Sequence, residues 1–141
     1  MAALGRLISW TINLGDSVSG GNLASYGSRF GYYTKVGNLV TVEGRMVDIN
    51  TSGMTSGNQL SILGLPYATH STGSMATGNV RLDRFSFDSS TVNLSVLVGN
   101  ADDYAALYET RSGLTDAAIL VSAITSGNAD LSFSITYRVS V

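Results

Sequence analysis

The last strand-like segment of the chain constrains the fold most. From position 131 to 139 apolar and polar residues alternate without a break: Leu, Phe, Ile, Tyr and Val hold the odd positions, and Ser, Ser, Thr and Arg the even ones. Successive side chains of a β-strand point to opposite faces, so this alternation places one set in a core and the other on water or a neighbour. A helix would scatter the same apolar set around its circumference. The segment predicts a half-buried strand.

A second segment, 39–49, is also β-like, but its apolar residues fall on both parities. Val and Met hold even positions 40, 42 and 46, whereas Leu, Val and Ile hold odd positions 39, 47 and 49. Gly44 in the middle of the run indicates a bulge or a close backbone approach. We therefore expect this strand to make contacts on both faces, one of them buried against another subunit.

Short apolar runs separated by Gly, Ser and Asn continue along the whole chain, as is typical of an all-β fold. Phe85 and Phe87 share a parity and are expected to anchor the core. The secondary structure of segment 102–110 is undecided between two alternatives. Asp102 could cap a one-turn helix, whereas Gly99-Asn100 before it fits a loop. Further strands are predicted at 7–14, 31–36, 60–63, 79–87, 92–98 and 118–124. Eight or nine strands without a long helix predict an antiparallel, jelly-roll-like β-sandwich.

The charge count excludes several classes of function. The 141 residues carry 8 Lys+Arg and 10 Asp+Glu, so 13% are charged and the net charge is −2. About 25% is usual in soluble proteins. No basic patch is available for nucleic acid, and no stretch of 18 or more apolar residues predicts a transmembrane helix. The start of the chain lacks the pattern of a secretory signal. Without cysteine, disulfides and thiolate metal sites are absent.

Residues that could carry catalysis are sparse. The one histidine, His70, lies in a loop-like stretch and is interpreted as solvated. Paired carboxylates can cleave glycosides, but Asp83 and Asp88 would face opposite sides of a regular strand. Asp102-Asp103 is interpreted as a cap or turn. Neither a calcium loop nor a phosphate-binding loop is present. We expect no enzymatic activity, no cofactor and no bound metal.

Tyrosine is the commonest aromatic residue, with 7 copies. Such side chains can stack on sugars or anchor a protein interface. Parity assigns Tyr137 to the core. Tyr104 and Tyr108, in segment 102–110, are the candidates for exposed ligand contacts. Trp10 lies in an apolar N-terminal run, and core or inter-subunit packing is the expected role.

Three motifs resemble, in order, those of tailed-bacteriophage virion proteins. Segment 30–45, Phe-Gly-Tyr-Tyr-Thr-Lys-Val-Gly-Asn-Leu-Val-Thr-Val-Glu-Gly-Arg, is similar to the family form Gly-x-Tyr-x-Lys/Arg-Val/Ile-Gly-Asn/Arg-x-Val-x-Val-x-Gly-Arg. Segment 63–67 resembles its Gly-Leu-Pro-Phe/Tyr element, and segment 131–138 its closing Phe-Ser-x-x-Tyr-Arg strand. Together the motifs extend over about residues 27–140.

The resemblance implies a β-sandwich, often trimeric, without catalytic residues. Members occur as distal modules of tail fibres and as small exposed virion proteins. Longer members carry a shaft or an anchoring domain. Residues 1–25 are therefore expected to serve as the attachment or oligomer-interface segment, and 26–141 to form a single β-sandwich domain. The candidate interface residues are Leu4, Leu7, Ile8 and Trp10.

Two functions follow from the resemblance. The favoured one is a trimeric protein that decorates and cements a phage capsid, with itself and the major capsid protein as partners. The alternative is a tail-fibre tip, or lectin-like module, that binds host surface polysaccharide. Both place the chain on the virion surface after synthesis in the host cytoplasm, with neither nucleic acid nor a membrane as partner.

Overall fold

The computed structural model describes residues 5–140, and this part of the chain is all-β. Every paired strand is antiparallel, and the only helix in the described residues is a short 3₁₀ turn, η1 (Val121–Ala123). The predicted all-β class is confirmed. The strands are β1 (Ile8–Ser9), β2 (Asn13–Gly15), β3 (Ser28–Val36), β4 (Leu39–Ile49), β5 (Ser61–Leu63), β6 (Ala76–Asp83), β7 (Thr91–Val98), β8 (Ala105–Arg111), β9 (Ala117–Ala118) and β10 (Ala129–Arg138).

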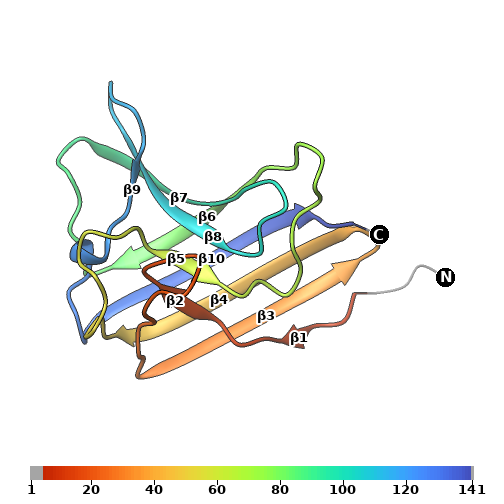
Figure 1. Cartoon of the computed structure of the whole chain (residues 1–141), viewed down its shortest axis with the longest axis horizontal. Helices are drawn as coiled ribbons and strands as arrows, with labels where there is room; N and C mark the ends of the chain where they lie inside the picture. Colours follow the sequence, from red (N-terminus) through yellow and green to blue (C-terminus); the bar gives the residue numbers. More distant parts are fainter. Residues whose placement is uncertain (1–4, 141) are drawn as a thin grey trace.

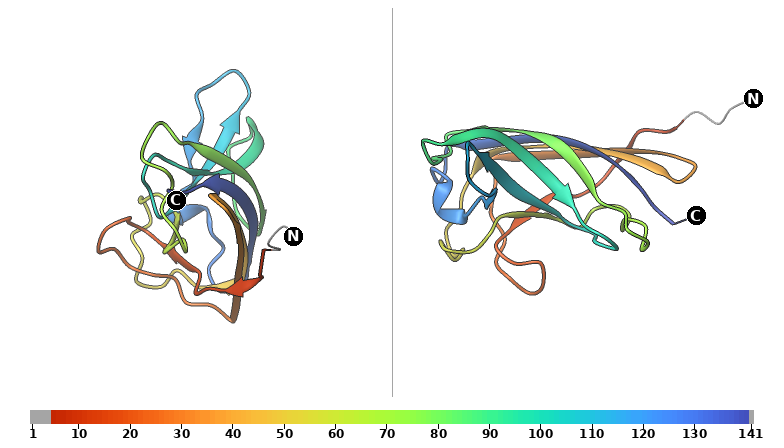
Figure 2. Two further views of the ribbon diagram at one scale, coloured as in Figure 1. Left: turned by 90° about the vertical axis from the view of Figure 1, so that its right-hand side faces the viewer. Right: turned by 90° about the horizontal axis from the view of Figure 1, so that it is seen from above.

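The strands form one continuous sheet, in the order β1-β3-β4-β10-β6-β7-β8-β5-β2, with β9 attached to β8. The sheet curls until its short strands lie over the long ones (Figure 1, and end-on in Figure 2). From the sequence we expected two sheets packed as a jelly-roll-like sandwich. The layers stay joined because β8 pairs with β7 along one edge and with β5 along the other.

The N-terminal segment connects the two edges of this curled sheet. β1 pairs with β3, the Trp10 amide donates to the Gly31 carbonyl at 2.9 Å, and β2 pairs with β5. Ile12 and Leu14 are fully buried in the common core. The sequence-based division at residue 25 therefore does not coincide with a boundary of the fold.

The alternation of apolar and polar residues predicted for segment 131–139 is confirmed in β10. All four apolar side chains at 131, 133, 135 and 137 are at most 5% exposed, while the intervening Ser, Thr and Arg side chains face outward. Burying a large apolar side chain contributes roughly 1.5–3 kcal/mol. β10 lies between β4 and β6, so its buried side chains occupy the middle of the core.

The apolar residues on both parities of β4 have a different cause from the expected one. On β10 the paired positions step by two, from Ala129 to Leu131, while on β4 they step by three, from Ile49 to Met46. The extra residue is a β-bulge, with Asp48 at a φ of 52°. The bulge returns Ile49 to the buried face that Met46 occupies. The inference of a second buried face from this parity change was therefore wrong at Ile49.

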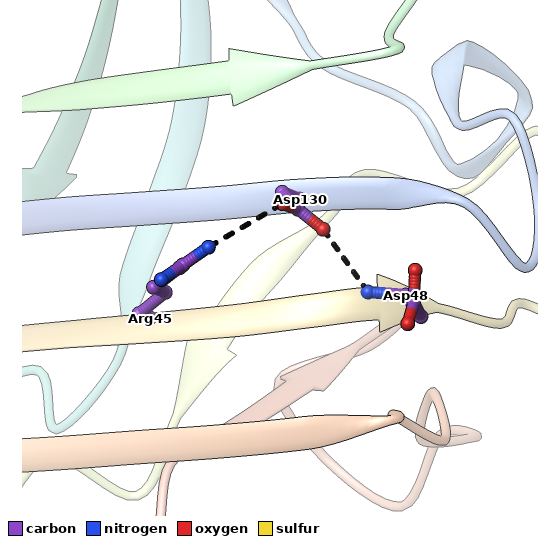
Figure 3. Close-up of polar contacts among 3 residues, drawn as sticks. All are labelled: Arg45, Asp48 and Asp130. Atoms are coloured by element: carbon purple, nitrogen blue, oxygen red, sulfur yellow. Dashed lines mark hydrogen bonds and ion pairs between the residues drawn. The ribbon is translucent and has the colours of Figure 1, made fainter.

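Asp130 holds the bulge from the neighbouring strand (Figure 3). Its carboxylate accepts a hydrogen bond from the Asp48 amide at 3.1 Å and lies 3.7 Å from the Arg45 guanidinium. Arg45 is largely exposed, and an exposed ion pair contributes only about 0–1 kcal/mol. The contact to the bulge amide is therefore the more important one, since it satisfies a backbone donor that the irregular ladder leaves free.

Two glycines shape the hairpin of β3 and β4. Gly37-Asn38 forms its turn, with Gly37 at a φ of 59°, as a two-residue hairpin with glycine in its first central position requires. Gly44 is a site of close approach and not of the bulge. A Cβ there would lie 2.6 Å from Ile12 Cδ1 and 2.8 Å from Phe133 Cε1.

Two stretches differ from their sequence interpretation. Segment 102–110, left open between a helix and a loop, is a turn followed by β8. Ala105, Ala106 and Leu107 are all buried, so both parities are apolar and the alternation that marks a half-buried strand is missing. The strand expected at 118–124 is only the short β9 followed by η1.

Candidate functional site

The catalytic combinations weighed from the sequence do not form in the described residues. His70 is held in its own loop, where Nδ1 lies 2.7 Å from the Thr72 hydroxyl. Asp83 ends β6 opposite Asp130, while Asp102 lies in the turn before β8. Within residues 5–140, no hydrogen bond or ion pair joins His70 to any of these carboxylates.

The sheet splits between β6 and β7. The two strands pair only over Ala76–Asn79 and Ser95–Val98. Beyond this point β6 stays with β10 as far as Asp83, and β7 stays with β8 back to Thr91. The connecting segment 84–90 returns across the opening between them (Figure 1). Unpaired strand ends and a crossing loop leave room for a cleft here.

Two cavities open at this place, and Phe87 and Asp88 line both. One has a volume of about 490 Å³ and is bordered by the side chains of Asn79 and Asn93. The other, of about 210 Å³, reaches Glu109 on β8. We call these two adjoining cavities the split cleft.

Phe87 forms an apolar wall of the split cleft. Its ring stacks on that of Phe85, with centroids 6.1 Å apart and planes at 9°. Both rings pack against the edge of the core and are half-buried. The predicted core anchors therefore lie at the border of the core, beyond the end of β6, and Phe87 also lines both cavities.

Glu109 is the buried polar group of the split cleft. It is only 9% exposed, and its Oε2 accepts a hydrogen bond from the Thr91 hydroxyl at 3.0 Å. A carboxylate offers about four acceptor positions, so one donor leaves most of them open to the cavity. Sequence reasoning missed this residue because it lay in the ambiguous 102–110 segment. A carboxylate two positions after Leu107, on the same parity, was the available signal.

Asp88 carries its negative charge into the same cleft. The Ser90 hydroxyl and amide donate to its Oδ1 at 2.6 Å and 2.8 Å. These hydrogen bonds, with a weaker contribution from the Arg111 charge, hold the pKa of the Asp88 carboxyl below its usual range. Asp88 is therefore ionised at neutral pH and serves as an acceptor, not as a proton donor.

A second surface lies on the outward face of β3. Phe30, Tyr32 and Val36 share a parity and are 51%, 38% and 51% exposed. Val36 pairs with Leu39 of β4, which is also exposed. We call these four side chains the outer stripe. A shallow hollow of about 310 Å³ beside it is bordered by Glu43 and Arg45. Contiguous exposed apolar side chains of this kind mark interaction surfaces.

The N-terminal interface candidates lie beside the outer stripe or under the sheet. Leu4 is outside the described residues. Leu7 and Ile8 are 60% and 39% exposed, Ile8 in the edge strand β1, where it pairs with Tyr33 of β3. Trp10 is half-buried and packs over Gly31, where its ring Nε1 has no hydrogen-bond partner within the described residues. Trp10 therefore packs against the core of its own chain, and Leu7, Ile8 and Trp10 stay candidates for an interface.

Tyr104 and Tyr108 are less accessible than expected. Both are half-buried, Tyr104 in the turn before β8 and Tyr108 on β8 between Ser95 of β7 and Ala118 of β9. Burial and the Asp102 charge raise the pKa of the Tyr104 hydroxyl, which stays protonated. These tyrosines lie apart from the residues that line the split cleft.

Residues 5–140 contain no group of three or more His, Asp or Glu side chains placed to hold a metal ion. The same residues include no helix with the length and apolarity needed to cross a bilayer.

Comparison with known proteins gives a likeness of fold. No family model and no curated protein matches the sequence. Among solved structures, the crystal structure of the Dettilon tailspike protein (gp208) is similar, with a TM-score of 0.66 and 16% identity. The match covers 95% of this chain and 24% of the tailspike chain. The curled sheet is thus similar in fold to part of a phage tailspike, and this chain spans about a quarter of that protein's length.

Proposed function

We propose that this chain is a virion protein of a tailed bacteriophage and acts as a non-enzymatic, trimeric module of the tail that contacts the host surface. The observation that carries the proposal is the likeness of nearly the whole chain to part of a tailspike. Because the fold is similar to part of a tailspike, it favours the fibre-tip alternative over capsid decoration.

The outer stripe supports assembly with further copies. Four exposed apolar side chains on adjacent strands would be unfavourable on a free monomer, and their burial between subunits removes them from water. Leu7 and Ile8 extend the same edge. Arg45 and Glu43, the cross-strand partners of Phe30 and Tyr32, border this surface and could form ion pairs across the interface. The partner is a second and a third copy of the chain.

The host contact is proposed as adhesion without turnover. Glycoside cleavage by a pair of carboxyl groups needs one that holds a proton as general acid, and the lowered pKa of the Asp88 carboxyl works against that role for Asp88. Release of reducing sugar ends from host polysaccharide would overturn this part of the proposal.

An adsorption competition tests the proposal. Host cells are incubated with the purified chain and then with the phage that encodes it, and free phage is counted over time. We expect slower adsorption in proportion to the protein added, with no release of reducing sugar ends. A host mutant without its surface polysaccharide is the control and should bind neither phage nor protein. Unchanged adsorption at saturating protein would contradict a host-contacting role.

A further inference from the structure

We propose that the split cleft binds a neutral sugar unit of the host surface polysaccharide and discriminates against acidic ones. This inference rests on the proposed function and adds to it the site and the class of ligand. The site differs from Tyr104 and Tyr108, which the sequence suggested, and from the outer stripe.

The shape of the cleft comes from the strand pairing. β6 and β7 separate after Asn79 and Ser95, and no side chain other than Phe87 and Asp88 borders both cavities. The larger cavity, of about 490 Å³, falls within the roughly 300–1,000 Å³ of small-molecule sites. It opens at the rim beside Val92 and Asn93, which are both exposed. An extended chain can therefore place one unit inside while the rest stays in solvent.

The lining has the chemistry that recognises sugars. A pyranose presents hydroxyl groups around its rim and an apolar C–H face. Amides at Asn79 and Asn93 donate and accept hydrogen bonds, and carboxylates at Asp88 and Glu109 accept them. The ring of Phe87 supplies an apolar surface next to these groups.

Glu109 gives the strongest reason to expect a ligand with hydroxyl donors. A buried carboxylate is costly unless hydrogen bonds satisfy it. Thr91 supplies one such bond, and the Glu109 side chain also borders the 210 Å³ cavity. Within the described residues no cation forms an ion pair with it. Hydroxyl groups of a bound sugar would satisfy the open acceptor positions.

Charge sets the discrimination. Among the described residues, two carboxylates and no Lys or Arg line the cavities. The guanidinium of Arg111 donates from Nε to the Thr115 carbonyl at 3.1 Å, and its charge acts on Asp88 from outside the lining. A uronate or phosphate group in the cleft would face the like charges of the exposed Asp88 and the buried Glu109, and repulsion grows where a charge is shielded from water.

The test uses polysaccharide purified from the host envelope and separated by anion exchange into neutral and acidic fractions. Binding of each fraction to the purified chain is measured by calorimetry in buffer with EDTA. We expect the neutral fraction to bind and the acidic fraction to bind at least tenfold more weakly. Phe87→Ala and Glu109→Gln should each weaken binding by about tenfold or more, which is the effect of losing roughly 1.4 kcal/mol.

Two further variants keep the result interpretable. Asn93→Ala changes only an exposed rim side chain, so its binding loss would not reflect unfolding. Glu43→Gln alters a carboxylate at the hollow beside the outer stripe and should bind as the wild type does.

The outcomes separate this inference from the proposed function. Wild-type affinity in all three cleft variants overturns the sugar site but leaves host contact intact, provided that the adsorption competition succeeds. Equal or stronger binding of the acidic fraction overturns the charge argument. A repeat without EDTA identifies a cation site: binding seen only in the buffer without EDTA would assign the cleft to a cation and also overturn the inference. Failure of both calorimetry and competition refutes the tail function itself.

Discussion

At the scale of single residues, Asp16 is the most heavily hydrogen-bonded side chain of the described chain. Its carboxylate accepts from the Asn22 amide at 2.6 Å, from Asn22 Nδ2 at 3.2 Å and from the Thr55 amide at 2.7 Å. It is 3% exposed. The Thr55 amide and the Asn22 side chain lower the pKa of this carboxyl below the ordinary 3.8. The hydrogen bonds of Asp16 thereby connect the loop after β2 to the turn around Thr55.

A pH-dependent contribution to stability follows from that lowered pKa. Because the folded value lies below the unfolded one, the stabilisation is complete above pH 3.8 and is lost as the pH falls further, through the folded value. Asp16→Asn should melt well below the wild type at pH 7, and the difference should shrink at pH 2.5. Thermal melts at both pH values measure it, with the exposed Asp116→Asn as the control. A difference that is the same at both pH values would refute this role.

At the scale of elements, the attachment of the N-terminal segment depends on glycine. A Cβ at Gly31 would lie 2.7 Å from the Trp10 carbonyl oxygen and 2.9 Å from its ring Nε1. The neighbouring backbone cannot move without disturbing the Trp10–Gly31 hydrogen bond. Gly31 thus permits residues 8–15 to cross from one sheet edge to the other.

Gly31→Ala should therefore destabilise the fold by about 1–3 kcal/mol, as overpacking does. Since Trp10 is the one tryptophan of the chain, its fluorescence reports the change directly, and we expect emission shifted to the red. Gly57→Ala is the matched control, because nothing lies within 4 Å of its added Cβ, and should change stability by no more than about 0.5 kcal/mol. Equal stability of the two variants would contradict the close approach.

How much the sequence predicts also depends on the element. β10 was predictable because one of its faces contacts the core and the other faces solvent, so apolar and polar residues alternate along it. β8 was not, because both of its faces are buried at Ala105, Ala106 and Leu107, so the residues there do not alternate. The prediction for β4 failed at Ile49 because a bulge at Asp48 shifts the register of the strand. This bulge can be recognised only from the pairing with β10. Glu109 and Asp88 are distant in sequence, so only folding brings them to one cleft.

At the scale of the whole molecule, the outer stripe predicts the assembly state. Light scattering should give a mass three times 14.8 kDa. Phe30→Asp places a charge in the stripe and should shift the protein to the monomer, while Leu114→Asp, an equally exposed apolar residue on the loop before β9, should leave the trimer intact. A monomeric wild type at micromolar concentration would refute assembly through this face.

The central claim is that the chain belongs to the phage tail, and its place on the virion tests that most directly. Antibodies raised against the purified chain and coupled to gold are bound to intact virions and viewed by electron microscopy. We predict label at the distal end of the tail and none on the capsid. Label distributed over the head would contradict the tail assignment and restore capsid decoration.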